Sequence, residues 1–449
     1  MDILESSLAR EIETISNNTN TQVSHYWRAE IHAGGLTFPA IKVLSIDVVR
    51  DFESKFTDEV LLQLVLSGGK YAYRVYPHLS NLEITLYKQP LTETGGMPDD
   101  SRSVLSERYT ATLLDPIAIN ITSNSINEPD ETALDLTNAL TLNFQLINKA
   151  MEQVRMKTIG GIYRRTKVED VIKSVLTMHS SNLEVDAQYM PKGVEMEPSQ
   201  NKSVQEHIVI PHGTRLVDVP EYIHKNCSGI YTTGLAYYYQ MNHWYVFPPY
   251  DSSRFNESPQ TLTIIRVPAN RMPGVERTYR KDGNNLVILA TGQATVKNES
   301  ESLLLSQGNG VRFADASQFM DKIVKKEGNK ALVSRGGSND EFVAIQRANG
   351  NNMVMSSPKR ITSNPWLEYS KLAARNGSLL GMTWENSNPS LIIPGMPVKV
   401  LYLEEEQIKE TYGRVIKAHD YTQTQGEGIT ASKHRTTTSL VIFAQRELK

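Results

Sequence analysis

Histidine, cysteine and glycine patterns that hold metals or phosphates are incomplete in this sequence. The nearest histidines, His207 and His212, are five residues apart and enclose no glutamate, whereas the zinc-protease motif needs a histidine pair at positions i and i+4 around a glutamate. The single cysteine, Cys227, excludes an intrachain disulfide and any cysteine-based metal cluster. Gly308-Asn-Gly310 lacks the third glycine of a dinucleotide-binding turn. We therefore expect no metal and no cofactor.

Serine–lysine and carboxylate pairs offer a second kind of chemistry, hydrolysis by a nucleophile or by acid–base catalysis. Ser199 and Ser356 each precede a lysine by three residues, but both lie in polar, loop-like sequence without the partner motifs of serine–lysine hydrolases. Asp99-Asp100 and Glu404–Glu406 fall in predicted exposed loops, where no burial would raise the pKa of one carboxyl for acid catalysis. Solvated charge runs explain both better. The sequence predicts that the protein is not an enzyme.

Aromatic residues gather in one stretch, and they are the strongest binding candidates outside the acidic run. Residues 230–247 include four that we select as interface candidates, Tyr237, Tyr239, Trp244 and Tyr245. Such rings could form a platform that stacks on sugars. They could equally form a core and an interface, where tyrosine and tryptophan are enriched. We favour core plus interface, and we keep receptor or glycan binding as the alternative function.

Length and charge limit the class of protein further. A chain of 449 residues predicts roughly two to four domains. A net charge of −3 provides no basic field for neutralising phosphates, which argues against nucleic-acid binding over the whole molecule. Met1–Glu5 lacks the basic and apolar regions of a signal peptide. The longest apolar run, Val60–Leu66, is too short for a membrane span, so we expect no membrane segment.

The first third of the chain predicts a β-domain preceded by a helix. Apolar residues recur at helical spacing within residues 1–19, which indicates a short amphipathic helix, either docked on its own domain or serving as an arm for a neighbouring subunit. From 20 to 157 the apolar residues mostly alternate, as in the strands of a barrel or sandwich. Gly68-Gly69 is expected to turn a hairpin there, with Tyr71–Tyr76 as the returning strand.

A compact α/β domain is expected over residues 158–258. Thr166, with Glu169 three residues later, predicts the N-cap of a helix. A second helix fits residues 216–224, and the aromatic stretch then predicts a β-hairpin.

Residues 259–298 and 364–449 predict a second β-domain, interrupted by a loop-rich insertion over 299–363. Pro394-Gly395 is a strong turn signal because proline presets φ and glycine accepts a positive φ. Alternating residues predict a strand directly after this turn.

An acidic segment follows that strand. We expect Glu404 to Tyr412 to project from the domain and Gly413 to begin the returning strand. Four of its residues are interface candidates for a contact arm: Glu404, Glu405, Glu406 and Tyr412.

Four passages of the chain resemble the baseplate hub of bacteriophage tails, which is related to the amino-terminal part of VgrG-type spike proteins. They are Tyr71–Tyr76 with Leu82–Tyr87, Phe144–Leu176, Ile223–Pro248 and Ile393–Leu440. The first is similar to paired strands of the hub's first tube domain, and the second to the exit from that domain into a helix. The third is similar to the helix and hairpin of the intervening domain, and the fourth to the close of the second tube domain.

The resemblance implies a mainly β fold with α+β character, in which two tail-tube-like antiparallel β-barrel domains flank the α/β domain. It implies a homotrimer whose six β-domains form a ring between a sixfold tail tube and a threefold central spike. The implied partners are the tail tube protein, the central spike protein, the tape measure protein and baseplate wedge proteins, with DNA only in transit through the channel. The implied location is the tail tip of the virion, after assembly in the host cytoplasm. VgrG-type chains continue into a spike, whereas this sequence stops at Lys449, so we expect the spike to be a separate chain or absent.

Overall fold

The computed structural model describes most of the chain. The described residues are 10, 12–15, 24–91, 104–116, 138–269, 277–292, 311–315, 330–335, 341–346, 353–356, 364, 366–367, 370, 373–374, 377–404, 407–426 and 433–445. Within them most strands join one 14-stranded sheet, accompanied by three smaller sheets. The fold is therefore mainly β, as predicted.

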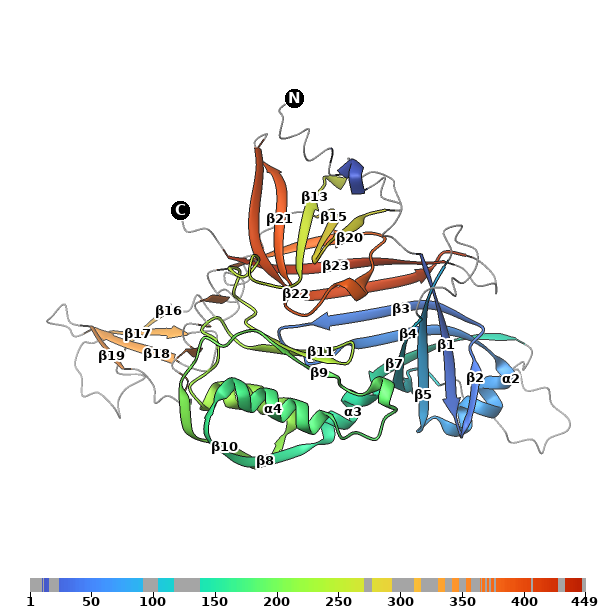
Figure 1. Ribbon diagram of the computed structural model, residues 1–449, viewed down its shortest axis with the longest axis horizontal. Coiled ribbons are helices and arrows are strands. Elements are labelled where there is room, and N and C mark those ends of the chain that lie inside the picture. The colour runs from blue at the N-terminus through green and yellow to red at the C-terminus, as the bar shows by residue number, and fades with distance from the viewer. Residues whose placement is uncertain are drawn as a thin grey trace.

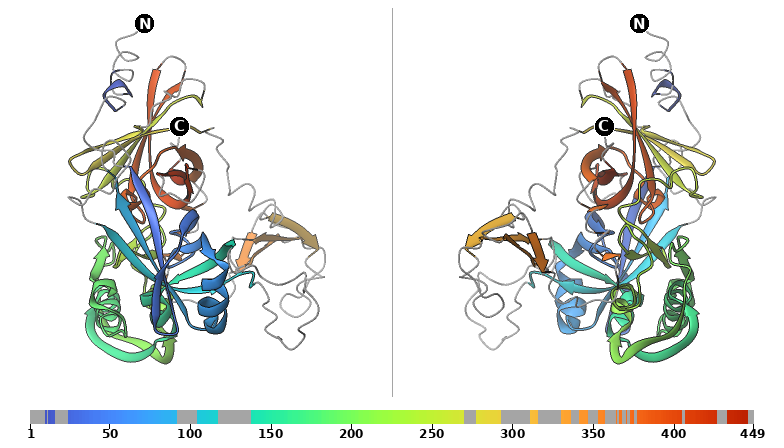
Figure 2. Two further views of the ribbon diagram at one scale, coloured as in Figure 1. Left: turned by 90° about the vertical axis from the view of Figure 1, so that its right-hand side faces the viewer. Right: turned by 90° about the vertical axis from the view of Figure 1, so that its left-hand side faces the viewer.

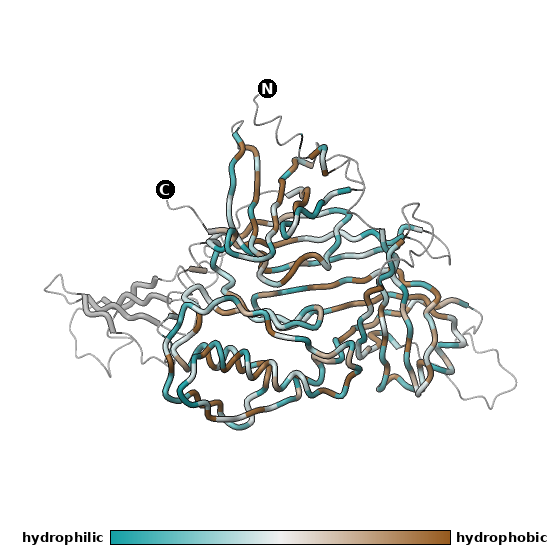
Figure 3. The backbone as a smooth tube through the Cα atoms, in the orientation of Figure 1, coloured by the Kyte–Doolittle hydropathy of each residue, from teal (hydrophilic) through white to brown (hydrophobic). Residues whose placement is uncertain are grey.

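The first set of strands in the large sheet comes from the N-terminal third of the chain. These strands are β1 (His25–Ala33), β2 (Leu36–Pro39), β3 (Lys42–Asp51), β4 (Glu59–Ser67), β5 (Leu82–Pro90), β6 (Leu105–Leu113) and β7 (Ala139–Asn148). They form because apolar and polar residues alternate, so that one face of each strand can be buried. In β4 the buried face consists of Val60, Leu62, Leu64 and Leu66. Figure 3 shows the resulting alternation of hydrophobic and hydrophilic segments along the strands.

The second set comes from the C-terminal half. These strands are β13 (Thr261–Arg266), β14 (Tyr279–Asp282), β15 (Asn285–Ala290), β20 (Gly377–Trp384), β21 (Pro397–Glu404), β22 (Gln407–Thr424) and β23 (His434–Gln445). The expectation of a purely antiparallel set is wrong for β13, which pairs in parallel with both β15 and β21. β13 is buried along most of its length, as parallel strands usually are.

Two strands, β22 and β23, belong to both sets. β22 pairs with β21 through its first half and with β3 through its second half. β23 pairs with residues 413–424 of β22. The pairing path β22–β3–β4–β7–β6–β5–β1–β23 returns to β22, with β1 joined to β23 at His25 and His434. A second path, β22–β21–β13–β15, continues through a bridge between Thr291 and Thr383 to β20 and β23. We call these the first and second strand circuits.

The α/β unit lies below the large sheet in Figure 1. It contains the helices α3 (Lys149–Met156), α4 (Val168–Ser180) and α5 (Val219–Asn226), the ribbon β8 (Thr158–Lys167)–β10 (Val204–Arg215), and the sheet β11 (Ala236–Gln240), β12 (His243–Phe247) and β9 (Gly193–Met196). Helix α4 lies between the ribbon and this small sheet and buries an apolar stripe against both.

The predicted N-cap of α4 is wrong. Strand β8 continues to Lys167, so Thr166 pairs with Gln205 in the ribbon and the helix begins only at Val168. Glu169 makes no capping box. It accepts a hydrogen bond from the Ser199 backbone N–H at 3.1 Å instead.

The strand predicted at Tyr71–Tyr76 is also wrong, and this passage was one of the four that carried the resemblance. Residues 68–78 form a continuous helical segment, with Gly68–Lys70 α-helical, Tyr71–Val75 π-helical and Tyr76–His78 a 3₁₀ turn. Tyr71, Ala72 and Val75 are buried while Tyr73 is exposed. This spacing of buried positions fits one face of a helix, whereas a strand would have buried alternate residues.

The acidic projection is a β-hairpin. β22 begins at Gln407, six residues before the predicted start at Gly413, and its first residues pair with the end of β21. Figures 1 and 2 show this hairpin rising from the large sheet on the side away from the α/β unit.

Two further regions bear on predictions made from the sequence. Ile15, in the short described part of the N-terminal helix, is fully buried against residues of β13 and β15, so this helix contacts its own chain. The region predicted to be a loop-rich insertion contains a separate four-stranded antiparallel sheet of β16 (Val311–Asp315), β17 (Lys330–Arg335), β18 (Glu341–Gln346) and β19 (Met353–Ser356).

Candidate functional site

The aromatic hairpin β11–β12 separates two hydrophobic cores. Met241 and Asn242 at its turn both have positive φ, as a two-residue hairpin turn requires. On one face Tyr239 and Trp244 are buried in the core of the α/β unit, where the Trp244 Nε1–H donates to Ser180 Oγ at 3.1 Å. On the other face Tyr238 lies in the core of the second circuit.

The four aromatic interface candidates are therefore not brought together on one surface. Tyr237 is half-buried on the face of the α/β core, and Tyr245 is half-buried on the opposite face. Burial raises the pKa of Tyr245 to about 12, so its phenol is neutral at physiological pH. Trp244 and Tyr239 face the interior and are not available to stack on a sugar.

The candidates of the acidic hairpin are only partly described. Glu404 ends β21 opposite Gln407, while Glu405 and Glu406 lie outside the described residues. Tyr412 lies further down the hairpin, where its O–H donates to Glu410 at 2.9 Å and its ring packs 5.5 Å from that of Phe255.

Arg414, which sequence reasoning missed, joins the α/β unit to the second circuit. Its side chain is fully buried on β22 and binds both carboxylate oxygens of Glu197, at 2.5 and 2.9 Å. The same guanidinium donates to the backbone oxygens of Asp251 at 2.6 Å and Gly395 at 2.8 Å. The sequence feature that could have indicated a buried role for Arg414 is its place between Gly413 and an apolar run, at a strand position that faces the core.

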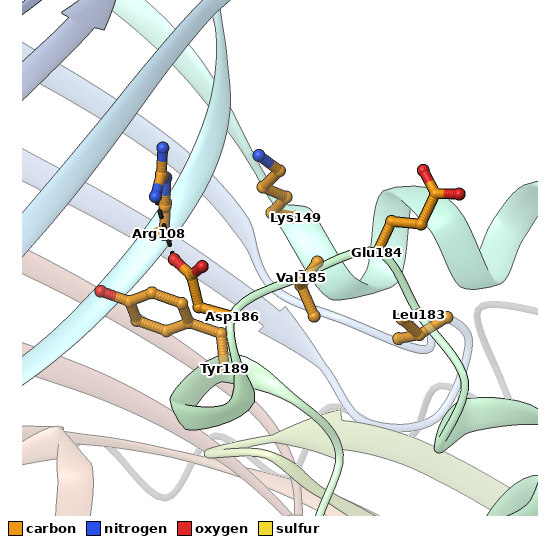
Figure 4. Close-up of a pocket in the computed structure, with 7 residues that line it drawn as sticks. All are labelled: Arg108, Lys149, Leu183, Glu184, Val185, Asp186 and Tyr189. Atoms are coloured by element: carbon orange, nitrogen blue, oxygen red, sulfur yellow. Dashed lines mark hydrogen bonds and ion pairs between the residues drawn. The ribbon is translucent and has the colours of Figure 1, made fainter.

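A surface ion network joins the first circuit to the α/β unit around a hollow of about 380 Å³ (Figure 4). Arg108 on β6 contacts Asp186 at 3.1 Å and Glu83 at 2.7 Å, and Lys149 on α3 also pairs with Glu83. Burial alone would raise the pKa of Glu83, but these two cations outweigh it and lower the pKa. All these groups are partly solvated, so the network positions α3 and the 183–189 segment more than it stabilises them.

A second cavity, of about 360 Å³, lies where the first circuit, the α/β unit and the segment before β21 meet. We call it the junction cavity. Its lining includes the acidic and basic residues Arg50, Asp58, Lys88, Glu107, Lys192 and Asp420, together with the phenol of Tyr109. None of these residues was selected from the sequence, because the pattern of each strand shows only isolated charges.

The arrangement of these sites suits structural joints between parts of the chain. Across the described residues no group of three His, Cys, Asp or Glu side chains is placed to hold a metal ion. None of the helices in the described part of the chain is long and apolar enough to cross a membrane.

Comparison with known proteins gives one family match and several similar structures. The family model described as the Bacteriophage PBS1 gene 109 protein matches residues 90–312. No curated protein matches the chain.

Three similar structures are tail or secretion-system proteins. The tail protein from Neisseria meningitidis MC58 is 13% identical, with a TM-score of 0.41 over 93% of this chain and 96% of that chain. The 43 kDa tail protein of prophage MuSo2 from Shewanella oneidensis is 10% identical, with a TM-score of 0.43 over 92% and 96%. The E. coli c3393 protein, a component of the type VI secretion system, is 9% identical, with a TM-score of 0.41 over 93% and 77%.

The family model that matches residues 90–312 is that of a bacteriophage protein, so the resemblance to a phage protein predicted from the sequence is confirmed.

Proposed function

We propose that the chain is the structural, non-enzymatic hub of a phage tail. In this proposal three copies form a ring of six β-domains that adapts a sixfold tail tube to a threefold central spike. The ring surrounds part of the channel through which the tape measure protein and then DNA pass. Baseplate wedge proteins contact its outside.

The observation that carries the proposal is the pair of strand circuits that share β22 and β23. A pseudo-sixfold ring built from a trimer needs two β-domains per chain at a fixed mutual angle. Two strands common to both circuits hold that angle by backbone hydrogen bonds, which a flexible linker would not do. We assign the two circuits to the two tube-like barrels. Residues 20–157, closed by the shared strands β22 and β23, form the first, and residues 259–298 with 364–449 form the second.

The family match supports a place in a phage particle, and we propose the tail tip of the virion as the location. The shape of the β21–β22 hairpin supports its role as a contact arm, because it extends away from both cores. A glycan-binding function receives no support from the aromatic hairpin, since Trp244 is fully buried.

The stoichiometry of the purified protein tests the proposal. Native mass spectrometry and light scattering over a range of concentrations should give a species of three chains. Mixing with the tail tube protein should give a complex that contains this trimer. A monodisperse monomer or dimer at high concentration, unchanged by the tube protein, would overturn the proposal.

A further inference from the structure

The junction cavity is crossed by polar contacts between parts of the chain that are distant in sequence. Arg50 on β3 forms a buried ion pair with Asp420 on β22 and donates to the Pro389 carbonyl oxygen at 3.2 Å. The Lys88 ammonium on β5 donates to Asn388 Oδ1 at 2.6 Å and to Ser390 Oγ at 3.0 Å. These contacts tie the first circuit to the 388–390 segment.

The α/β unit reaches the same cavity through Gln240, which lines it, and through Tyr238, which contacts the lining residue Asp58. The Tyr238 O–H donates to Asp58 Oδ1 at 2.7 Å, and Gln240 Nε2 donates to the Ile392 carbonyl oxygen at 3.1 Å. Glu107 on β6 accepts a hydrogen bond from Tyr109. Three parts of the chain are thus held together by groups that line one hollow space.

Several of these groups lack the partner that their burial would demand. Arg50 and Gln240 are both more than nine-tenths buried, and among the described residues neither the Arg50 Nε–H nor Gln240 Oε1 has a hydrogen-bond partner. Lys88 is equally buried, and its contacts above are with neutral acceptors. The hydrogen bonds of Asp58 and Glu107 are with tyrosine hydroxyls, and the cations Arg50 and Lys88 act on these carboxyl groups through space without outweighing the effect of burial. Buried charges without ionic partners are costly and respond strongly to protonation.

The lining does not select a charged ligand. Three cationic side chains, Arg50, Lys88 and Lys192, face three anionic ones, Asp58, Glu107 and Asp420. The unpartnered atoms include both a donor and an acceptor. Water therefore satisfies the cavity better than any single class of ion, and the distinctive property of the site is how its own groups titrate.

We propose that the junction cavity is a pH-sensitive joint, in which the protonation states of Asp58, Lys88 and Glu107 set how tightly the first circuit, the α/β unit and the 388–392 segment close on one another.

The carboxyl groups favour a closed joint in acid. Burial raises the pKa of Asp58 and of Glu107, so each holds its proton more tightly in the closed joint than in an open, hydrated one. Their contribution to closure is therefore present at low pH and is lost as pH rises through the raised pKa values.

Lys88 affects closure of the joint in the opposite direction, because its charged form is the protonated one. Burial lowers its pKa from 10.5 to about 7, so the closed joint holds this proton less tightly than the open joint. The cost of burying the ammonium is fully present below pH about 7 and fades as pH rises toward 10.5. Tyr109 and Tyr238 remain neutral because burial raises the pKa of both phenols, and Arg50 and Asp420 stay paired. The closed joint is therefore weakest where the carboxyl groups have lost their protons and Lys88 still holds its own.

Hydrogen exchange on the whole chain tests the proposal. The Tyr239 amide, which donates to the Phe56 carbonyl oxygen at 2.8 Å, and the Ile392 amide, which donates to Pro389, report on closure. Amides of α4 serve as an internal reference for global unfolding. Protection factors of the two reporters relative to α4 should fall as pH rises through the raised pKa values of the carboxyl groups and recover as pH rises from about 7 toward 10.5, by at most about tenfold per pH unit for each proton exchanged.

Two variants test which group causes the change in protection on the acid side of this profile and which causes the change on the alkaline side. Glu107→Gln should raise the protection of the reporters at neutral pH and flatten the acid limb, and Lys88→Met should flatten the alkaline limb. Glu206→Gln and Lys173→Met, which change exposed residues of β10 and α4, are the matched controls and should leave the profile unaltered. The proposal is overturned if the reporters follow α4 at every pH in the unaltered protein, or if both junction variants keep the parental profile. Should a variant fail to fold, the profile of the unaltered protein alone decides.

Discussion

At the scale of single residues, Arg414 and His224 show how buried polar groups fix the fold. Arg414 supplies four hydrogen bonds across a joint that apolar contacts alone would not orient. His224, on α5, accepts a hydrogen bond from the Ile230 N–H at 3.1 Å, so its Nδ1 carries no proton. Each can be tested by one substitution.

Replacement of Arg414 by methionine should destabilise the protein by about 3 kcal/mol, because Glu197 and two backbone carbonyl oxygens lose their buried cation. Urea unfolding monitored by circular dichroism measures this change. Arg435→Met is the control, since the exposed pair of Arg435 with Glu385 should contribute less than about 1 kcal/mol. Equal losses in the two variants would contradict a special role for Arg414.

Acid should weaken the fold through His224. Burial lowers its pKa from 6.5 to about 4, so the unfolded chain binds this proton more readily than the folded chain. Stability is then lost as pH falls from about 6.5 toward 4, with a slope of up to about 1.4 kcal/mol per pH unit from this group. Unfolding curves of His224→Gln across this range should show a shallower slope than the parent, and an unchanged slope would contradict the assignment to His224.

At the scale of elements, local patterns predicted most strands and failed where tertiary packing decided. Alternating apolar residues gave β3, β4 and β7 correctly because one face of each packs on a core. Residues 71–76 also alternate in type, yet they are helical, since the core contacts made by Tyr71 and Val75 lie one helical turn apart. The turn at Pro394-Gly395 was predicted from residue type alone, and Gly395 has a φ of +67°.

Gly395→Ala tests that turn. An added Cβ would overlap the ring of Phe247, which is buried, in addition to the strain of positive φ. We expect a loss of about 2 kcal/mol or more in the free energy of unfolding. Gly35→Ala has a similar φ with open space around the added Cβ, so it should cost only about 1 kcal/mol. Similar costs for both would show that Phe247 yields to the new methyl group.

At the scale of the whole molecule, the contacts that define the architecture join residues far apart in the chain. The Arg50–Asp420 pair spans 370 positions, and β22 pairs with β3 over a similar distance. Periodicity within a window of sequence carries no information on such pairings. The junction cavity and the Arg414 joint therefore could not be predicted, whereas the number and order of many strands could.

The hairpin β21–β22 gives the prediction at this scale. Charge reversal by Glu404→Lys, Glu405→Lys and Glu406→Lys should impair assembly into the three-chain species and leave the fold of the single chain intact. Light scattering measures the first effect and circular dichroism the second. Lysine substitution of three exposed glutamates elsewhere, Glu184, Glu206 and Glu221, is the control, because it changes the net charge by the same amount. Normal assembly of the triple variant would make the segment an ordinary solvated hairpin.

The sharing of β22 and β23 also imposes an order on biosynthesis. Strand β3 leaves the ribosome early, but its neighbour β22 follows only after more than 350 further residues, which takes on the order of tens of seconds at ordinary translation rates. Until then one edge of β3 has no strand to pair with, and an unpaired edge invites association with other chains. A chain cut short before β22 would keep that edge permanently. Closure of the first circuit therefore depends on the last strands of the chain to be translated.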